Sequence, residues 1–270
     1  MNFSDEQVER YSRHIILTEV GPQGQEKILT ANVLIIGCGG LGAPAALYLA
    51  AAGVGTIGLV DPDNVELSNL QRQIIHFTPD VGKPKTLSAQ AKINQINPQV
   101  KVVTYNERVT AANISAIIRD YDFIIDGTDN FAAKFLINDA CVLGAKPFSH
   151  GGILRFDGQA MTYVPGTACY RCVFIAPPPK GSVPSCSQAG ILGAIAGMLG
   201  TIQAAEALKF IIGKGDLLVN RLLIFNALAM KFREVSFQKN PACPICGKQP
   251  SIKELKDEEL PACDLKGKPR

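Results

Sequence analysis

The sequence predicts an α/β protein with a Rossmann-like, mostly parallel sheet, helices on both faces, and antiparallel strands added in the C-terminal half. Three observations indicate this class. Short apolar runs alternate with helical segments as far as about residue 150. A glycine-rich turn follows the first of these runs, and two Cys-x-x-Cys pairs in the second half have the form of a metal site.

The first half of the chain is predicted to consist of strand–helix units. Residues 5–29 are expected to form one or two short helices, with Ser4 as the N-cap. Short apolar runs predict buried strands at residues 32–36, 56–60, 100–105, 122–126 and 146–150. Helices are expected between them at residues 40–52, 83–96, 111–119 and 131–143. Because strands and helices alternate, the sheet should be parallel with both faces covered.

The pattern changes after Gly151. Residues 158–164 alternate like an antiparallel strand, and residues 222–225 and 231–237 predict a hairpin. Residues 189–212 predict a long buried helix, because their apolar run, residues 189–202, is shorter than the roughly 20 residues of a membrane span. The proline-rich residues 176–187 should form an exposed loop. We expect one domain over residues 1–250 and a charged, loosely held tail over residues 251–270.

Composition excludes several classes of protein. The chain has 270 residues and a net charge of +3, too small to predict a nucleic-acid partner or a membrane surface. The first residues are polar and acidic, unlike a signal or transit peptide. Eight cysteines without a secretory signal are typical of a reducing compartment, so a cytoplasmic location is expected.

The two cysteine pairs are the most specific feature. Cys169 and Cys172 form one pair, Cys243 and Cys246 the other, and both lie in turn-forming sequence. Two such knuckles complete a tetrahedral Cys₄ zinc site, which has no open position for water and is therefore structural. The metal would join the C-terminal segment to the body of the domain. The alternative is a pair of redox or disulfide motifs.

A nucleotide site is predicted at residues 37–42. Here a G-x-G-x-x-G sequence joins a strand to a helix, so that the backbone can approach a phosphate at the helix N-terminus. Asp61 ends the next strand, where a carboxylate would accept from ribose hydroxyls. By itself, this motif favours a dinucleotide and a dehydrogenase.

Charged residues beyond Asp61 favour a triphosphate instead. Arg72 and Lys85 would balance charge on phosphate oxygens. Asp129 follows a buried strand at its C-terminal end, where a carboxylate could hold Mg²⁺. The alternatives are ordinary solvated charges for Arg72 and Lys85, and an N-cap of the following helix for Asp129.

Together these residues resemble the MoeB/ThiF/HesA family, bacterial relatives of ubiquitin-activating enzymes. The matching stretches occur in the family's order and cover the chain from about residue 8 to 247. They are residues 10–13, 37–42, 68–73, 82–85 and 127–130, and both cysteine pairs. The set in order is specific, although each motif alone is weak.

The resemblance implies an adenylyltransferase that uses ATP, Mg²⁺ and a structural Zn²⁺. Its substrate would be the C-terminal glycine of a ubiquitin-like sulfur-carrier protein, whose carboxylate attacks the α-phosphate and releases pyrophosphate. Arg13 resembles an arginine that reaches into the neighbouring protomer's site, which implies a homodimer. The remaining implied site residues are Gly37, Gly39, Gly40, Gly42 and Asp61 for the nucleotide, Asn69, Arg72 and Lys85 for phosphates, and Asp129 for Mg²⁺.

Other cysteines and histidines receive smaller roles. Cys186 resembles a family cysteine that can bond covalently to the carrier, with an inert thiol as the alternative. Cys38 and Cys141 are expected to be small core residues, and Cys263 has no visible partner. The remaining positions need no functional role: His76 and His150 are assigned to structure, and His14 stands where many relatives have glutamine.

Three other functions remain open at this point. They are an NAD-dependent oxidoreductase with a structural zinc, a tRNA-modifying relative that dehydrates a threonyl base, and a non-catalytic subunit. The paired knuckles argue against the second, and retention of Arg13, Arg72, Lys85 and Asp129 argues against the third. Some relatives carry a C-terminal rhodanese domain, but this sequence ends about 24 residues after Cys246, so a separate sulfur donor is expected. The carrier could belong to molybdopterin or thiamine synthesis, and we lean towards the molybdopterin type.

Overall fold

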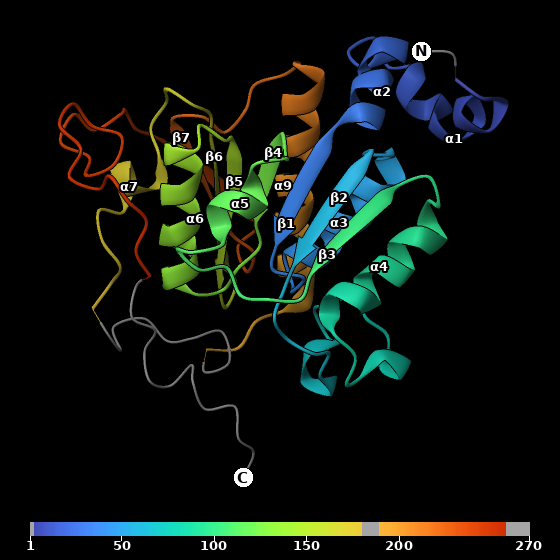
Figure 1. Cartoon of the computed structure of the whole chain (residues 1–270), viewed down its shortest axis with the longest axis horizontal. Helices are drawn as coiled ribbons and strands as arrows, with labels where there is room; N and C mark the ends of the chain where they lie inside the picture. Colours follow the sequence, from blue (N-terminus) through green and yellow to red (C-terminus); the bar gives the residue numbers. More distant parts are fainter. Residues whose placement is uncertain (1–2, 180–188, 258–270) are drawn as a thin grey trace.

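Eight strands form one sheet in the order β3-β2-β1-β4-β5-β6-β7-β8 (Figure 1). The structure is a computed structural model that describes residues 3–179 and 189–257. The strands are β1 (Asn32–Ile36), β2 (Thr56–Val60), β3 (Lys101–Tyr105), β4 (Phe123–Asp126), β5 (Phe148–Leu154), β6 (Asp157–Tyr163), β7 (Arg221–Asn226) and β8 (Lys231–Ser236). The first five pair in parallel and the last three are added antiparallel, which confirms the predicted fold class.

The register of the parallel strands positions the candidate site. Ile36 at the end of β1 is paired with both Val60 at the end of β2 and Asp126 at the end of β4. Parallel strands that end in register release their loops at one edge of the sheet. The glycine-rich turn, the Asp61 segment and the Asp129 turn therefore leave the sheet side by side.

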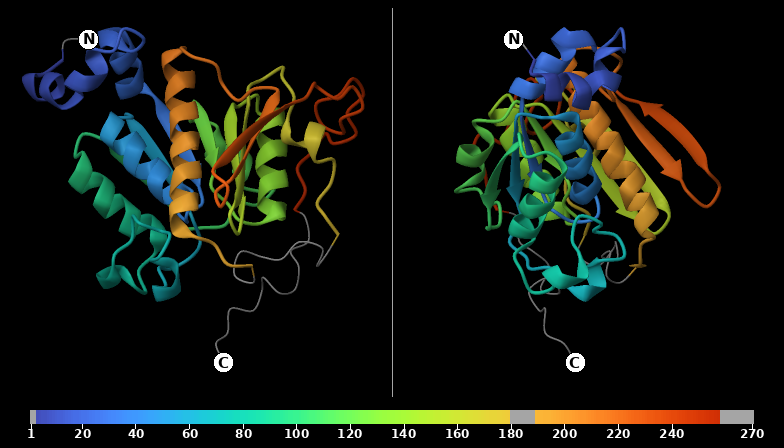
Figure 2. Two further views of the ribbon diagram at one scale, coloured as in Figure 1. Left: turned by 180° about the vertical axis from the view of Figure 1, so that it is seen from behind. Right: turned by 90° about the vertical axis from the view of Figure 1, so that its right-hand side faces the viewer.

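Helices cover both faces of the parallel part. They are α3 (Gly42–Ala52), α4 (Lys85–Ile96) and α9 (Gly193–Ile212) on one face, and α5 (Ile114–Ile118) and α6 (Phe131–Leu143) on the other (Figures 1 and 2). Successive side chains of β1 point to opposite faces of the sheet and pack into two different cores. Val33 and Ile35 pack under α3, whereas Leu34 and Ile36 pack under α6. Both faces are buried, as an apolar strand without alternation predicts.

The long helix α9 is buried in the structure as the sequence predicted. Among the described residues, it is the one helix that is long and apolar enough, by composition, to cross a membrane. It packs instead against α3 and across β4, β5 and β6, with Leu199 and Ala207 fully buried. It also carries Gln203 and Glu206 in buried, hydrogen-bonded positions. These contacts are those of a core helix.

Two helices, α1 (Asp5–Ile15) and α2 (Gly21–Thr30), lie at the end of the sheet where β1 begins (Figure 1). Ser4 caps α1 in a capping box with Gln7, as predicted. Arg10 donates to the Ile96 carbonyl at the end of α4, which fixes α1 at this end of the fold. The glycine-rich turn lies at the other end, because it precedes α3 and α3 runs back along the sheet.

Several element boundaries differ from the predictions. The helix expected at residues 111–119 covers only Ile114–Ile118, because Asn113 accepts from the Thr110 N–H and holds residues 110–113 in a turn. The strand expected at residues 146–150 continues to Leu154, since β6 pairs with it beyond the end of β4. The sequence also gave no sign of α7 (Tyr170–Val173), a four-residue helix inside the first cysteine pair.

Candidate nucleotide-binding site and metal centre

The turn at residues 37–42 is built so that only glycine fits at two positions. Gly37 has φ +97°, and a β-carbon there would lie 2.8 Å from the Gly127 carbonyl oxygen. A β-carbon on Gly42 would lie 1.9 Å from the Gly37 carbonyl oxygen. Leu41, the N-cap residue of α3, makes no capping hydrogen bond with its side chain. The turn therefore leaves the positive end of this 11-residue helix open to a phosphate.

Asp61 is buried directly behind this turn. Its carboxylate accepts from the Cys38 N–H at 2.8 Å and from the Asp63 N–H at 2.9 Å. Burial raises the pKa of the Asp61 carboxyl, and the nearby Lys85 ammonium opposes that rise. The side chain is thus positioned at the turn, as the ribose assignment requires.

Lys85 is also brought into the site. Its ammonium lies 3.0 Å from Asp63 and 3.9 Å from Asp61, and the residue is 6% exposed. Burial alone would lower the pKa of Lys85, but these carboxylates outweigh burial and raise it. Lys85 is therefore a charged, buried residue of the site and not a solvated surface charge.

The residues between Asp61 and α4 pack against the same turn. The aliphatic part of Arg72 would be 3.5 Å from a β-carbon on Gly40, and its guanidinium donates to the Ser68 carbonyl at 3.1 Å. Asn69 is buried in the short 3₁₀ helix η1 (Leu67–Asn69). Within the described residues the buried Gln73 Oε1 has no hydrogen-bond partner, and its amide nitrogen faces Gly39. Such an unpaired polar atom fits a site that binds a polar ligand.

Asp129 lies next to the turn on its other side. The Gly127 N–H donates to the Ile36 carbonyl at 2.9 Å, so the Asp129 turn directly contacts the glycine-rich turn. The Asp129 carboxylate is exposed and makes no hydrogen bond among the described residues. Asn130, and not Asp129, caps α6, because its side chain accepts from the Ala133 N–H. The N-cap alternative for Asp129 is therefore wrong, and its carboxylate is free to bind a cation.

A buried network supports the Asp129 turn and was missed in the sequence. Asp126 accepts from the Thr128 N–H and hydroxyl, from Lys134 at 3.1 Å and from His150 Nδ1 at 2.9 Å. The Gln203 amide donates to the Asp126 carbonyl from α9. An aspartate at a buried strand end and a lysine within an apolar helix were the signals available, because buried opposite charges pair.

The charges of this network follow from burial and contact. Burial alone would raise the pKa of Asp126, but Lys134 and His150 outweigh it and hold that pKa well below its usual range. Burial lowers the pKa of His150, and Lys134 adds to this effect. The network at neutral pH is therefore an Asp126 carboxylate, a Lys134 ammonium and a neutral His150 that donates from Nδ1.

Arg13 lies far from these residues. Its helix packs at the C-terminal end of α3, where a β-carbon on Gly53 would touch Tyr11. The glycine-rich turn is at the N-terminal end of α3, about 16 Å away for an 11-residue helix. Arg13 is exposed, and the length of α3 keeps it away from the candidate site of its own chain. Cys186 and Cys263 lie outside the described residues.

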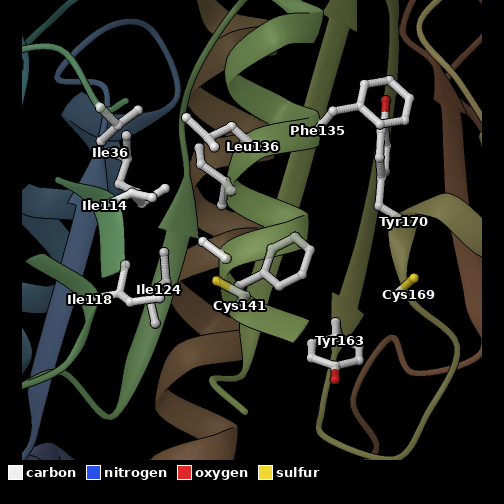
Figure 3. Close-up of a cluster of buried hydrophobic side chains, with 14 of the residues drawn as sticks. Ile36, Ile114, Ile118, Ile124, Phe135, Leu136, Cys141, Tyr163, Cys169 and Tyr170 are labelled. Carbon is white, nitrogen blue, oxygen red and sulfur yellow. The ribbon is translucent and has the colours of Figure 1, made fainter. Parts of the chain in front are cut away.

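The four paired cysteines converge on one point. Their Sγ atoms lie within 4.8 Å of one another, with Cys169–Cys172 at 4.0 Å, Cys169–Cys243 at 3.7 Å and Cys172–Cys246 at 3.3 Å. A tetrahedral zinc with bonds of about 2.3 Å requires S···S separations of about 3.8 Å. The donor set and its spacing therefore fit zinc. Figure 3 shows that Cys169 adjoins the core under α6, near Tyr163 and Tyr170.

Taken together, the fold and the site define a class of nucleotide-binding α/β protein. A glycine-rich turn, the buried Asp61 carboxylate, two cations and an exposed carboxylate share one edge of the sheet, and a cluster of four cysteines lies outside it. The chain belongs to the ThiF family, whose family model matches residues 11–245.

Curated relatives of known name cover nearly the whole chain. A sulfur carrier protein adenylyltransferase of Thermus thermophilus is 46% identical over 96% of this chain and 98% of its own length. The SAMP-activating enzyme E1 of Haloferax volcanii is 47% identical over 89% of each chain. A probable adenylyltransferase/sulfurtransferase MoeZ of Mycobacterium tuberculosis is 46% identical, and the match spans 65% of its length.

Solved structures share the fold. Escherichia coli MccB superimposes with a TM-score of 0.81 at 25% identity, over 96% of this chain and 77% of that chain. A structure of MccB with ATP gives a TM-score of 0.75 at 25% identity, over 88% of this chain and 73% of that one.

Proposed function

We propose that this protein adenylylates the C-terminal carboxylate of a ubiquitin-like sulfur-carrier protein with ATP. The carrier's carboxylate oxygen forms a bond to the α-phosphorus, the bond to the bridging oxygen breaks, and pyrophosphate leaves. The observation that carries the proposal is the glycine-rich turn at an uncapped helix N-terminus, flanked by Asp61, Lys85 and Asp129. The names of the relatives that match over nearly their whole length support this substrate class.

The residues at the site act by holding ATP in position and balancing charge. The N–H groups at the start of α3 bind the phosphates, and Asp61 accepts from the ribose hydroxyls. Asn69, Arg72 and Lys85 donate to phosphate oxygens as negative charge passes to the pyrophosphate. Asp129 holds Mg²⁺, which supplies additional charge neutralisation when bound.

The Cys₄ centre is proposed to hold zinc with a structural role. Four thiolate ligands fill a tetrahedral ion and leave no position for a substrate. The ion joins the segment around Cys243 and Cys246 to the knuckle that follows β6. The centre shares no residue with the nucleotide site.

We further propose a homodimer in which Arg13 of one copy enters the nucleotide site of the other. Arg13 is exposed at the end of the fold opposite to the nucleotide site of its own chain. It could therefore contact a nucleotide only in the site of a second copy. Five of the apolar side chains that are at least half exposed among the described residues support such an interface. They are Ile16 and Leu17 after α1, Tyr48 on α3, and Ile74 and Phe77, which line a cavity of about 200 Å³ with Leu47.

An NAD-dependent oxidoreductase is the weaker alternative. The relatives that match most of this chain are named as adenylyltransferases or activating enzymes. Two cations beside the phosphate turn also suit a triphosphate better than a dinucleotide.

The test is ATP–pyrophosphate exchange with Mg²⁺ against purified carriers that end in Gly-Gly. Exchange with one carrier, and none without it, is the expected result, and the responding carrier identifies the pathway. A carrier of molybdopterin synthesis is our first choice and a thiamine-type carrier the second. Absence of exchange with every carrier, despite bound ATP, would overturn the proposed function. A separate sulfur donor is expected to act on the adenylylated carrier.

A further inference from the structure

His76 connects three parts of the nucleotide site. It follows the segment that carries Asn69, Arg72 and Gln73, and it is 3% exposed. Its Nε2 lies 3.0 Å from the carbonyl oxygen of Cys38 in the glycine-rich turn. Its Nδ1 lies 2.9 Å from the Ser88 hydroxyl on α4, the helix that begins with Lys85. One imidazole thus joins the turn, the Arg72 segment and the Lys85 helix.

The two partners and the burial of the ring together set its protonation state. A carbonyl oxygen can only accept, so Nε2 must carry the proton. The Ser88 hydroxyl can donate or accept, and because burial lowers the pKa of His76, Nδ1 carries no proton at neutral pH and accepts from Ser88. His76 is therefore neutral with the proton on Nε2, whereas His150 donates from Nδ1 to the Asp126 carboxylate and has the opposite tautomer.

The Cys38 residue is held on both sides by this arrangement. Its N–H donates to Asp61 at 2.8 Å, and its carbonyl accepts from His76. Cys38 stands between Gly37 and Gly39, which have no side chains of their own to restrict the turn. The orientation of the N–H groups that would meet phosphate therefore depends on these two contacts.

We propose that His76 is a positioning residue for nucleotide binding, which holds the glycine-rich turn in register with Arg72 and Lys85 through Cys38 and Ser88. The inference rests on the proposed nucleotide site. His76 does not touch the nucleotide; it acts through the backbone carbonyl behind it. Misplacement of a binding group by about 1 Å can cost roughly 100-fold in rate.

The surroundings of His76 make this contact sensitive to acid. The charged groups near it are Lys85 and Lys92 on α4, Asp80 in the 3₁₀ helix η2 (Thr78–Asp80), and Asp61 across Cys38. Burial lowers the pKa of His76, the Cys38 carbonyl and Asp80 oppose this, and the two lysines add to it. Protonation would turn Nδ1 into a donor, so the Ser88 hydroxyl could no longer donate to the ring and would have to accept from it instead, which changes the contact between the ring and α4. Nucleotide affinity should be constant above about pH 6.5, the ordinary pKa of histidine. It should decrease as the pH drops through the lowered pKa of His76.

The test combines the tautomer with nucleotide affinity. The chain contains three histidines, so ¹⁵N NMR of histidine-labelled protein can assign each ring by single substitution. Affinity for MgATP is measured by calorimetry without a carrier, from pH 5 to 8, for the wild type and for His76→Gln, His76→Phe and Ser88→Ala. His14→Gln is the control, because His14 bonds only to Gln25 at the opposite end of the fold among the described residues.

The expected results differ between the variants. His76 should show a proton on Nε2 at pH 7. His76→Gln can still donate to Cys38 and accept from Ser88, so it should stay within about threefold of wild type at pH 7, and its affinity should fall less than that of wild type between pH 7 and 5. His76→Phe should lose roughly 10- to 100-fold in affinity while its melting temperature shows a folded protein. Ser88→Ala should lie between these two.

Other results would overturn the inference. They are a proton on Nδ1 of His76, wild-type affinity in His76→Phe, or a loss in that variant that matches its unfolded fraction. An acid dependence in His76→Gln as steep as that of the wild type would also contradict it. Failure of the proposed function is separate, since it would appear as wild-type protein that binds MgATP and catalyses no exchange with any carrier.

Discussion

Asp129 is the residue whose structure most directly suggests a catalytic role. Its carboxylate is exposed beside the glycine-rich turn, while the neighbouring Asn130 takes over the capping of α6. Asp126, the buried residue at the end of β4, makes the structural contacts to Thr128, Lys134 and His150. The two aspartates of this short segment thus have different roles: Asp126 holds the turn in place, and Asp129 is free to bind a ligand.

Asp129→Asn should lower the rate of ATP–pyrophosphate exchange by roughly 10²- to 10³-fold, because a neutral amide oxygen binds Mg²⁺ more weakly than a carboxylate does. Its free energy of unfolding should stay within about 0.5 kcal/mol of wild type, since the side chain is exposed. Asp216→Asn, an exposed aspartate beyond the far end of α9, is the matched control. Exchange at the wild-type rate in the Asp129 variant would remove this residue from the mechanism.

The buried network makes a separate prediction about pH. His150 is neutral in the folded protein with a lowered pKa, so its contribution to stability is complete above about pH 6.5 and is lost as pH falls towards the lowered value. Asp126, whose pKa is also lowered, loses its contribution in the same direction but only below about pH 4. The free energy of unfolding should therefore decrease steadily on acidification.

Urea unfolding between pH 7 and 5 can isolate the histidine. In His150→Asn the amide still donates to Asp126 but does not titrate, so the slope of unfolding free energy against pH should fall by up to about 1.4 kcal/mol per pH unit. The slope that remains includes His76, whose pKa is lowered as well. An unchanged slope in His150→Asn would show that His150 has the same pKa in the folded and unfolded chains.

At the scale of elements, the Cys₄ centre joins parts that are distant in sequence. The first knuckle contains α7, and Arg171 within it forms two 2.7 Å contacts with Asp139 on α6. The second knuckle contributes Cys243 and Ile245 to the core under α6. Loss of the ion would remove the link between the two knuckles and leave the C-terminal segment held by Ile245 in the core and by Asp257, which accepts from the Ala111 N–H.

Cys243→Ser should abolish zinc binding, reducing the metal measured by mass spectrometry from one ion per chain to none. The free energy of unfolding should fall by about 2 kcal/mol or more, and trypsin should cut sooner at Lys253 and Lys256. Cys141→Ala, a buried cysteine outside the cluster, should keep its metal. One zinc per chain in Cys243→Ser would show that the Cys₄ assignment is wrong.

At the scale of the whole molecule, the two ends of the sheet have different roles. The nucleotide residues gather where β1, β2 and β4 end, whereas α1 and Arg13 lie where those strands begin (Figure 1). Within one copy the two cannot meet. In a two-fold dimer each copy can supply the residue that the other copy lacks.

Mixing two inactive variants tests this arrangement. Arg13→Ala and Asp129→Ala should each be nearly inactive as homodimers. When equal amounts are unfolded and refolded together, about half of the dimers should be mixed, and each mixed dimer has one intact site, giving about one quarter of wild-type activity. No recovery, in samples where subunit exchange is confirmed by mass, would contradict the shared site.

Local patterns were sufficient for much of the fold. The alternation of apolar runs and helices predicted every strand of the parallel part, because each run must be buried on both faces. The turn at residues 37–42 and the cysteine pairs were identified for a similar reason, since phosphate binding and tetrahedral zinc require particular residues at fixed spacing. The boundaries were less accurate where a side chain such as Asn113, or a pairing strand such as β6, set the end of an element.

The sequence alone thus determined the class of sheet and located the glycine-rich turn and each cysteine pair, because each is specified by residues that are close together in the chain. Only the tertiary structure decided which distant side chains meet. The contacts of His76 with Cys38, of His150 with Asp126, and of Lys85 with Asp61 each join residues that lie 20 or more positions apart. The order and register of the strands determine these contacts, and neither can be predicted from a short stretch of sequence. The order and register of the strands also place Arg13 at the end of the fold opposite to the nucleotide site of its own chain.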